Sequence, residues 1–386
     1  IVYNEETGEY VDSTAWDVSA RGDKSIIAWY ETNNSKGALK VHIGSNDEIF
    51  ANQNSGLLFA NIGVDSICTA TETITNLELL NTESVFNMSN MFMNCGYFAM
   101  TKLTLPSTFN TSKVENMNSM FSGCGFISMT SLELNSNFDT RNVVDMGSMF
   151  NFCGYSKMTK LDLTSGANET NTIQFNTSKV ENMMAMFMNC GGSKMESLNL
   201  GTNFNTENVT NMKYMFAKTG KEKMTSLNLG HKFNTSNVTN MNGMFYECGY
   251  TVMAELNLGD KFNTSKVTNM REMFNSCGYT EMTSLDLGDL FYTSKVTDMY
   301  KMFYNCGKTK MNVIDLGAAF TTIPSGKITK QTSDYESWEE DKITNYNAYD
   351  SFMEGCGTNG LVIYAPESIF SDEKNFKFTN TDITFE

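Results

Sequence analysis

The stretch MAELNLGDKFNTSKVTNMREMFNSCG, residues 253–278, decides the fold of this chain. Its first block, Met253–Gly259, alternates polar and apolar residues before a glycine, which is typical of a short strand with one buried face. The block Val267–Met270 alternates in the same way and predicts a second strand. Cys277-Gly278 and the variable polar residues after it predict a turn. A single unit of this kind cannot bury both of its faces, so the sequence predicts a stack of units.

The same unit recurs along most of the chain. Nine cysteines mark it at intervals that are mostly 29 residues or twice 29, and Thr219 stands at the one vacant position. A phenylalanine lies three residues before each of these positions from Phe92 to Phe303, and Phe352 is placed in the same series. A fixed period of this length is the signature of a repeat architecture.

Two interruptions leave the register intact on both sides, so they predict loops that leave the stack. Eight extra residues lie around 164–172 and 21 extra residues lie near 321–341. A weaker unit precedes the regular ones, because 58–63 echoes 91–96 and 74–79 echoes the first strand. About ten units at the spacing of paired strands predict a rod or arc roughly 45–50 Å long.

The sequence therefore predicts a β-rich repeat solenoid, a right-handed stack of coils with two short strands per repeat and a cap at each end. Residues 1–57 form the N-terminal cap, in which 26–44 reads as strand, turn and strand. Residues 58–357 form the solenoid. Residues 358–386 form the C-terminal cap, where 361–366 replaces the usual strand.

The cysteines invite a disulfide framework, but buried thiols are the favoured interpretation. Equivalent side chains in neighbouring coils run parallel, which suits bridging poorly, and no Cys-x-x-Cys pair indicates zinc. The methionines keep a fixed register and the recurrent Asn211, Asn240 and Asn269 fit a stacked structural role. The predicted core ladder comprises Cys95, Cys124, Cys153, Cys190, Cys248, Cys277, Cys306, Phe121, Phe150, Phe245 and Phe274.

Two features are candidate binding sites. The outward strand positions are small and polar, and a solvated face is favoured there over a calcium or sugar contact. Aromatic residues gather at the turns instead, as a binding strip or, in the favoured interpretation, as edge packing over the core; these are Tyr97, Phe126, Tyr155, Tyr250, Tyr279, Tyr246 and Tyr304. The long insertion adds Tyr335 and Trp338, because long insertions in a compact fold are often functional.

Composition excludes several classes of function. The net charge of −16 and the pI of about 4.7 disfavour nucleic acid and anionic lipid as partners. No stretch approaches the roughly 18 apolar residues that cross a bilayer, so no direct membrane insertion is expected. No nucleophile, base and orienting group stand out as a set, and His231 fills the variable Asp260 position of the next unit. We expect no catalytic residues, metal or cofactor.

The run Phe-Asn-Thr-Ser-x-Val-Thr-Asn-Met-x-x-Met-Phe-x-x-Cys, at 233–248 and 262–277, resembles the BspA-like leucine-rich-repeat surface proteins of bacteria. Residues 16–20 through 49–52 look like the entry segment of that family. The resemblance implies a leucine-rich-repeat solenoid on an exported, often wall-attached protein of low-GC Gram-positive bacteria or similar organisms. It also implies adhesion to host matrix proteins, other cells or other microbes. The unit here is longer after Cys-Gly than the common family unit, so details of shorter members do not transfer.

These observations predict a monomeric, secreted or cell-surface protein, with wall anchoring as an option, that binds a host or microbial surface protein or glycan. The alternative is a structural spacer that projects another domain, and an enzyme is the least favoured reading. Arg21-Gly22-Asp23 spells the tripeptide that integrins recognise, but a match of three residues is weak and a simple turn is favoured.

Overall fold

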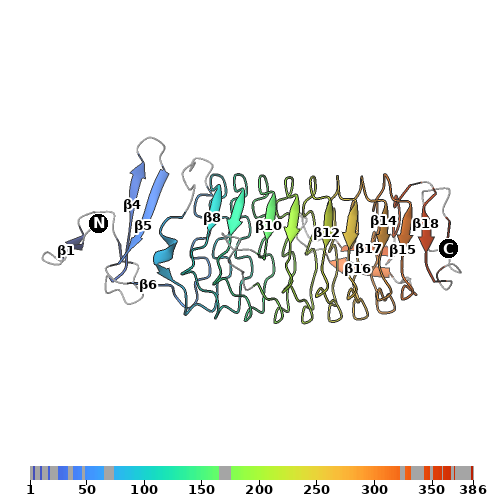
Figure 1. Ribbon diagram of the computed structural model, residues 1–386, viewed down its shortest axis with the longest axis horizontal. Coiled ribbons are helices and arrows are strands. Elements are labelled where there is room, and N and C mark those ends of the chain that lie inside the picture. Colours follow the sequence, from blue (N-terminus) through green and yellow to red (C-terminus); the bar gives the residue numbers. More distant parts are fainter. Residues whose placement is uncertain are drawn as a thin grey trace.

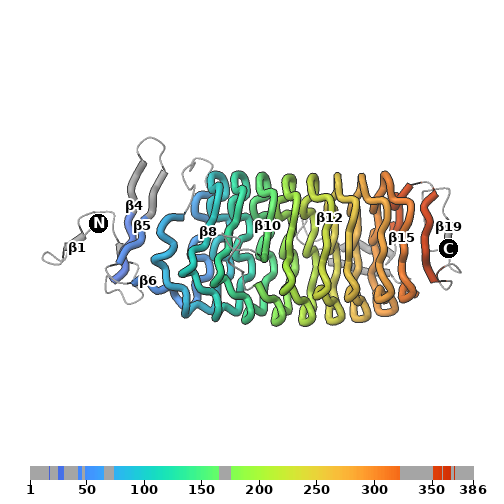
Figure 2. The backbone as a smooth tube through the Cα atoms, in the orientation of Figure 1, coloured from blue at the N-terminus to red at the C-terminus, as the bar shows by residue number. Residues whose placement is uncertain are grey.

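The computed structural model describes residues 3–4, 9–10, 16–17, 25–33, 38–45, 48–64, 74–164, 175–321, 327–331, 343–347, 351–358, 360–366, 369 and 384–385. This part of the chain is β-rich, and its helical content is little more than one 3-10 turn, η1 (Leu77–Leu79). Successive coils lie side by side along the long axis, and each repeats the path of the coil before it (Figures 1 and 2). The three-dimensional order of the coils is therefore their order in the sequence.

One three-residue strand per coil forms a column on one side of the molecule. In most of these strands the central residue is buried and its two neighbours face solvent, because successive side chains of a strand point to opposite faces. Pairing is parallel and residue for residue, so that Leu227 lies opposite Leu256. The strands are β8 (Lys102–Thr104), β9 (Ser131–Glu133), β10 (Lys160–Asp162), β11 (Ser197–Asn199), β12 (Ser226–Asn228), β13 (Glu255–Asn257), β14 (Ser284–Asp286) and β15 (Val313–Asp315).

The second strand predicted in each unit is reduced to one paired residue per coil. These residues bridge in parallel from Asn54 to Asp298. Three residues after the bridge the backbone turns into the left-handed region, as at Glu272 with φ 55°, so the extended run cannot continue. The bridging side chain also caps the turn: Asn240 Oδ1 accepts a hydrogen bond from the backbone N–H of Asn242 at 3.0 Å. The recurrent asparagines thus satisfy turn backbone, as the sequence predicts.

The segment from the bridging residue to the cysteine position, such as 240–248, is called the Met–Phe turn below. Its alternate backbone N–H groups point the same way along the stack and donate to carbonyls of the following coil. In one coil the donors are Met241, Gly243, Phe245 and Glu247, and the acceptors are Asn269, Arg271, Met273 and Asn275, at 2.8–3.0 Å. The Met–Phe turn of each regular coil therefore has a donor face toward the C-terminus and an acceptor face toward the N-terminus.

A continuous apolar core runs the length of the stack. The phenylalanine of each Met–Phe turn lies flat on its counterpart in the next coil, with ring centroids of Phe245 and Phe274 5.4 Å apart. A second column stacks beside it, with Phe233 and Phe262 6.4 Å apart. Full burial of one such side chain contributes roughly 1.5–3 kcal/mol, so repetition of these columns dominates the stability of the stack.

The residues of the predicted core ladder are all fully buried, and the eight described cysteines are free thiols. Cys68 lies outside the described residues. Burial disfavours the thiolate and raises the pKa of Cys95 and of Cys248 to about 12. Thr219 is also fully buried, and its hydroxyl donates to the Phe187 carbonyl at 2.6 Å. A hydroxyl can therefore replace the thiol because a backbone acceptor lies within reach.

At the N-terminal end, the predicted strand, turn and strand are confirmed by a hairpin of β4 (Ile27–Asn33) and β5 (Ala38–Gly44). The short strand β3 (Trp16–Asp17) pairs with β4 on its other side. Two further short strands, β1 (Tyr3–Asn4) and β2 (Glu9–Tyr10), pair with each other.

The first coil, residues 48–64, is the weak unit. Its strand β6 (Ile49–Phe50) pairs in parallel with β7 (Leu80–Asn81), and the Phe59 ring stacks on Phe92 at 5.2 Å. The echo of 58–63 in 91–96 is thereby confirmed. The strand predicted at 74–79 is wrong, because η1 occupies that position and is preceded by Asn76 in the left-handed conformation at φ 58°.

Near the C-terminus, β16 (Lys327–Gln331) and β17 (Ile343–Asn347) form an antiparallel hairpin that starts within the predicted 321–341 insertion. The other predicted insertion, 164–172, falls outside the described residues after Thr164. Strand β18 (Val362–Tyr364) pairs in register with β15, and β19 (Thr384–Phe385) pairs with β18. The sequence predicts that 361–366 replaces the usual strand, whereas β18 continues its column.

The last coil keeps the regular spacing but reverses the order of methionine and phenylalanine. Phe352 lies four residues before Cys356, not three, and the Phe303 N–H donates to its carbonyl at 2.8 Å. The prediction that places Phe352 in the phenylalanine series is therefore wrong: Phe352 holds the position of Met302, and Met353 holds that of Phe303. Gly355, at φ 70°, holds the left-handed position that Ser276 and Asn305 hold before the cysteine in the regular coils.

Candidate binding surfaces

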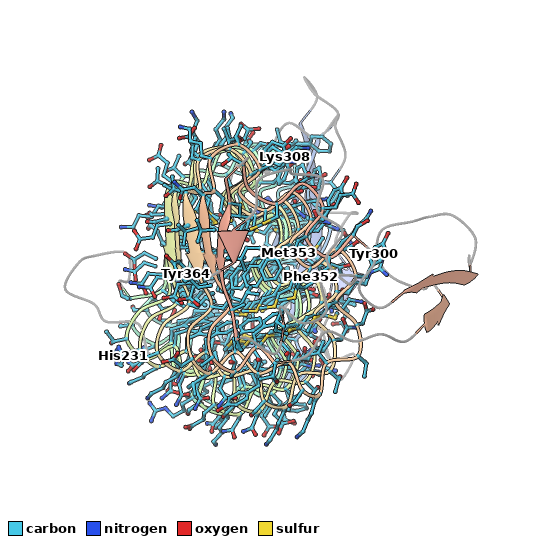
Figure 3. All side chains as sticks on the ribbon, turned by 90° about the vertical axis from the view of Figure 1, so that its right-hand side faces the viewer. His231, Tyr300, Lys308, Phe352, Met353 and Tyr364 are labelled. Carbon is cyan, nitrogen blue, oxygen red and sulfur yellow. The ribbon has the colours of Figure 1, made fainter. Side chains whose placement is uncertain are left out.

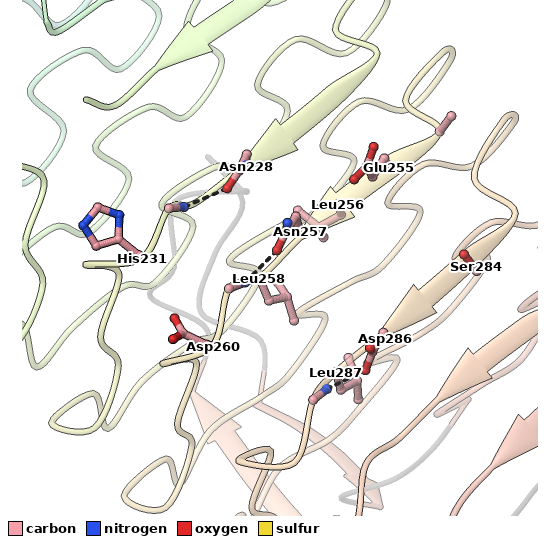
Figure 4. Close-up of a pocket in the computed structure, with 14 residues that line it drawn as sticks. Asn228, His231, Glu255, Leu256, Asn257, Leu258, Asp260, Ser284, Asp286 and Leu287 are labelled. Atoms are coloured by element: carbon pink, nitrogen blue, oxygen red, sulfur yellow. Dashed lines mark hydrogen bonds between the residues drawn. The ribbon is translucent and has the colours of Figure 1, made fainter. Parts of the chain in front are cut away.

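The strand column carries a polar groove over β12, β13 and β14 (Figure 4). Asn228, Asn257 and Asp286 each accept, through Oδ1, a hydrogen bond from the glycine N–H two residues on, at 2.8–2.9 Å. These side chains are therefore occupied in holding the glycine turns, whose φ values are positive. His231 and Asp260 line the groove from equivalent, exposed positions of neighbouring coils.

The groove offers hydrogen-bonding groups but no aromatic platform. Its lining is polar and glycine-rich, and it buries little apolar surface that a ligand could share. The full lining is Asn228, Gly230, His231, Ala254, Glu255, Leu256, Asn257, Leu258, Gly259, Asp260, Ser284, Asp286, Leu287 and Gly288.

A row of half-buried aromatic rings follows the Cys-Gly dipeptides, and it is called the Cys–Gly row. Tyr97 stacks on Phe126 with centroids 4.6 Å apart, and Phe126 stacks on Tyr155 at 4.8 Å. Tyr250 stacks on Tyr279 at 4.5 Å. The predicted aromatic positions therefore meet face to face across neighbouring coils, so each ring covers the ring before it and shows its edge to solvent.

The Cys–Gly row is interrupted between its two aromatic parts. Gly192 holds the next position after Tyr155, and a Cβ there would collide with the Tyr155 ring, so the ring lies over bare backbone. Lys221 follows, with its ammonium 5.1 Å from the centre of the Tyr250 ring, and Lys308 lies 5.6 Å from that of Tyr279. Cations therefore close both ends of the Tyr250–Tyr279 pair.

A second group of tyrosines and cations lies on the outside of the Met–Phe turns in the later coils. The Arg271 guanidinium lies 4.6 Å from the ring centre of Tyr300, and the Lys301 ammonium lies 4.9 Å from that of Tyr304. Lys218 lies 5.2 Å from the ring of Tyr246. In the view along the stack, Tyr300 lies on the side opposite Tyr364 of the strand column, with Phe352 and Met353 between them (Figure 3).

The two groups are joined where Lys221 contacts both. Its ammonium forms a 2.6 Å ion pair with Glu247 of a Met–Phe turn while it lies over the Tyr250 ring. Burial, Tyr279 and Glu247 together raise the pKa of the Tyr250 phenol, so it stays neutral and able to donate a hydrogen bond at physiological pH. We call the joined set the tyrosine–cation surface: Lys218, Lys221, Tyr246, Tyr250, Arg271, Tyr279, Tyr300, Lys301, Tyr304 and Lys308.

The predicted binding residues include Tyr246, Tyr250, Tyr279 and Tyr304 of this surface, but they miss Tyr300 and the cations that lie on the rings. The signal was present, because Lys221 and Lys308 hold the register position that an aromatic residue holds in other units. Tyr97, Phe126 and Tyr155 form a separate aromatic ladder in the earlier coils. Tyr335, Trp338 and Arg21-Gly22-Asp23 lie outside the described residues.

Within the described ranges, His, Cys, Asp and Glu form no cluster of three or more that could hold a metal ion. The same ranges contain no helix long and apolar enough to cross a membrane.

Comparison with known proteins gives one match. Neither the curated proteins nor the solved structures contain a sequence or fold that matches this chain. A family model described as "Mycoplasma protein of unknown function, DUF285" matches three times, at residues 65–165, 156–277 and 222–318. These matches cover the regular coils and more than half of the chain. The chain therefore belongs to the DUF285 repeat family.

Proposed function

We propose that this protein is a non-catalytic binding module of a bacterial cell surface, built as a BspA-like leucine-rich-repeat solenoid. The partner is a host or microbial surface protein or glycan. Support comes from the repeat family, from the stacked coils and from the signature shared with BspA-like proteins at 233–248 and 262–277. Export and attachment to the cell wall are part of the same proposal.

The observation that carries the binding role is the tyrosine–cation surface. The repeated phenylalanines of the Met–Phe turns are core, whereas here tyrosine rings are half-buried with Lys or Arg over them. Tyrosine and arginine are enriched among the residues that dominate protein-binding energy. The chain as a whole is acidic, with a net charge of −16. The Lys and Arg side chains over Tyr250, Tyr300 and Tyr304 therefore distinguish this surface from the rest of the molecule.

Repetition makes weak contacts sufficient. Because equivalent positions recur once per coil, an extended partner can meet several shallow contacts at once, and many copies on one cell multiply them. The surface therefore suits adhesion better than capture of a small molecule in a deep pocket.

The test is binding of the full chain to a panel of host matrix proteins and an array of glycans. The double variant Tyr250→Ser/Tyr279→Ser and the variant Arg271→Gln/Lys301→Gln should each lower affinity at least about tenfold, as expected for loss of a central aromatic or Arg contact. The matched control is Glu255→Gln/Ser284→Ala on the exposed strand column, which should leave affinity unchanged.

Two further results separate the alternatives. If replacing 332–342, with Tyr335 and Trp338, abolishes binding while the tyrosine variants do not, the insertion is the site and the tyrosine–cation surface is not. If the chain binds nothing and a larger distinct domain follows it in the precursor, the structural spacer takes the place of the adhesin. Specific turnover of any partner would contradict the non-catalytic assignment.

A further inference from the structure

The first coil exposes the acceptor face that every later coil buries. In the second coil, the carbonyls of Asn87, Ser89, Met91 and Met93 accept hydrogen bonds from the first coil at 2.8–3.1 Å. The corresponding carbonyls of the first coil are those of Asn54, Gly56, Leu58 and Ala60. Within the described part of the chain, no backbone or side-chain group donates to these four carbonyls.

The side chains of the first coil repeat this asymmetry. Asn87 and Asn94 donate through Nδ2 to Oδ1 of Asn54 and Asn61, at 3.0 and 3.1 Å, which leaves the amide nitrogens of Asn54 and Asn61 as donors for a coil on the other side. Phe59 is only half-buried, because its ring stacks on Phe92 on one side, whereas the later members of its series lie between two coils.

Exposed apolar residues surround this open end. Leu57 is 57% exposed and Leu58 is 41% exposed, and Phe50 of the same coil is 53% exposed. Leu57 also holds a left-handed backbone conformation, φ 67°, at a position where the second coil has Asn90. A leucine gains nothing from this conformation in water, whereas a covering coil would bury it.

We infer that the N-terminal face of the first coil is a docking surface for one more coil of the same repeat, supplied by another polypeptide. The open face contains the acceptor row, the amide donors and the ring face by which each coil already holds its neighbour, so the occupant continues an interface that the stack forms repeatedly. The occupant presents its donor face: N–H groups at alternate residues and an aromatic ring to lie on Phe59. Residues 1–47 of this chain lack the Met–Phe sequence, so they do not supply it.

Two copies of the chain that paired through this same face would leave its carbonyl groups without hydrogen-bond donors. Both would present carbonyl rows, and two rows of acceptors cannot hydrogen-bond to each other. At the far end of the stack, Phe352 and Met353 of the last Met–Phe turn are each 3% exposed, so that end of the core is already covered and is not open to a second copy. The inference is therefore a heterologous contact with a different chain.

The experiment uses the full chain and a labelled peptide with the sequence of residues 211–220, NMKYMFAKTG, which carries the Met–Phe turn without cysteine. In the stack its donors are the N–H groups of Met212, Tyr214, Phe216 and Lys218. Fluorescence anisotropy should show saturable binding. The same peptide methylated on the nitrogens of Tyr214 and Phe216 has the same charge and side chains, and it should bind at least about tenfold more weakly because two donors are lost.

Variants of the protein locate the site. Leu57→Asn places the residue of the second coil at the same left-handed position, where Asn is tolerated, and Leu58→Gln removes the neighbouring apolar group. Together they should weaken peptide binding at least about fivefold, whereas the control Val144→Asn, at an exposed apolar position in the middle of the stack, should not.

Three results would overturn the inference. The methylated and unmodified peptides could bind equally, in which case the carbonyl row is not used. Binding could be unaffected by Leu57→Asn/Leu58→Gln, in which case the peptide binds elsewhere. Sedimentation could show that the full chain self-associates and that these substitutions abolish the self-association, in which case the occupant is a second copy and not a different chain.

Discussion

At the scale of single residues, the cysteine column shows how burial makes a reactive side chain serve as an apolar core residue. Equivalent thiols lie in neighbouring coils, yet they pack as free side chains in the core. Their burial raises the pKa of Cys95, Cys248 and Cys356 to about 12. Because the thiolate is the nucleophile, these cysteines are inert toward alkylation while the protein is folded.

The raised pKa values predict that the free energy of unfolding falls in alkali. The unfolded thiols ionise above about pH 9, whereas the folded thiols stay protonated until about pH 12. The stabilisation is thus fully present below pH 9 and is lost as the pH rises toward 12, by about 1.4 kcal/mol per pH unit for each thiol. Urea unfolding at pH 8, 9 and 10 measures it.

The control for this prediction is Cys248→Thr, which copies the natural residue Thr219, a buried threonine that donates to a backbone carbonyl. The variant should fold at pH 8. Between pH 9 and 10 its free energy of unfolding should fall less than that of the wild type, and the difference should equal the contribution of one thiol, at most about 1.4 kcal/mol. Equal losses in the two proteins would mean that Tyr and Lys ionisation, and not the thiols, governs the alkaline transition.

At the scale of elements, the coil is the unit of both structure and energy. Leu227 pairs with Leu256 and Phe245 stacks on Phe274 because each coil repeats its neighbour residue for residue. In such an array each coil contacts only its neighbours, so stability is close to a sum of coil terms and interface terms. Folding therefore requires that neighbouring coils stay aligned residue for residue, and it does not require any particular coil.

Deleting one whole coil, residues 224–252, should therefore leave a folded protein. The deletion joins Lys223 to Met253, which takes the place of Met224, and keeps the 29-residue period. Urea unfolding should remain cooperative, with a smaller denaturant dependence because less surface is exposed. Deleting only 224–238 puts apolar positions out of register and should abolish cooperative unfolding; if both deletions behave alike, the coil is not the unit of folding.

The sequence alone predicts those elements whose side-chain pattern is simple. The strand column follows from alternation around residues such as Leu256, and the core ladder follows from periodicity at Cys277 and Phe274. The second strand could not be excluded, because the left-handed residue that ends it is Glu272 in one coil and Lys301 in the next, neither of which is a turn signal.

The candidate site was predictable only in part for a similar reason. Periodicity locates the Cys–Gly row and its tyrosines, but most cations over the rings come from a different coil, as Lys218 does over Tyr246. Such a pair becomes visible only once coils are set side by side. The acceptor face of the first coil is likewise a property of backbone direction, which a side-chain pattern does not contain.

At the scale of the whole molecule, the two ends of the stack are not equivalent to its middle. Among the described residues, the central coils exchange backbone hydrogen bonds with both neighbouring coils, whereas the first coil exchanges them only with the second. We expect hydrogen exchange at the Phe59 and Asn61 amides to be faster than at the Phe187 and Phe216 amides, although all four donate to the next coil at 2.8–2.9 Å.

Hydrogen–deuterium exchange with peptide-level mass spectrometry measures this gradient. Protection should increase from 54–63 toward the coils around 183–245. Uniform protection along the stack would show that the whole molecule opens as one unit. Binding of the peptide of residues 211–220 should slow exchange in the first coil and leave the central coils unchanged.

The sulfur-rich spine has a consequence for survival in oxidising surroundings. The methionines and cysteines of the core, such as Met244, Met273 and Cys277, are fully buried between coils, so dissolved peroxide has no path to them while the coils stay closed. Oxidation of a methionine to the sulfoxide would make an apolar core side chain polar and would weaken the packing of that coil against its neighbour. Ageing of this molecule would then begin at a frayed terminus and advance inward one layer at a time.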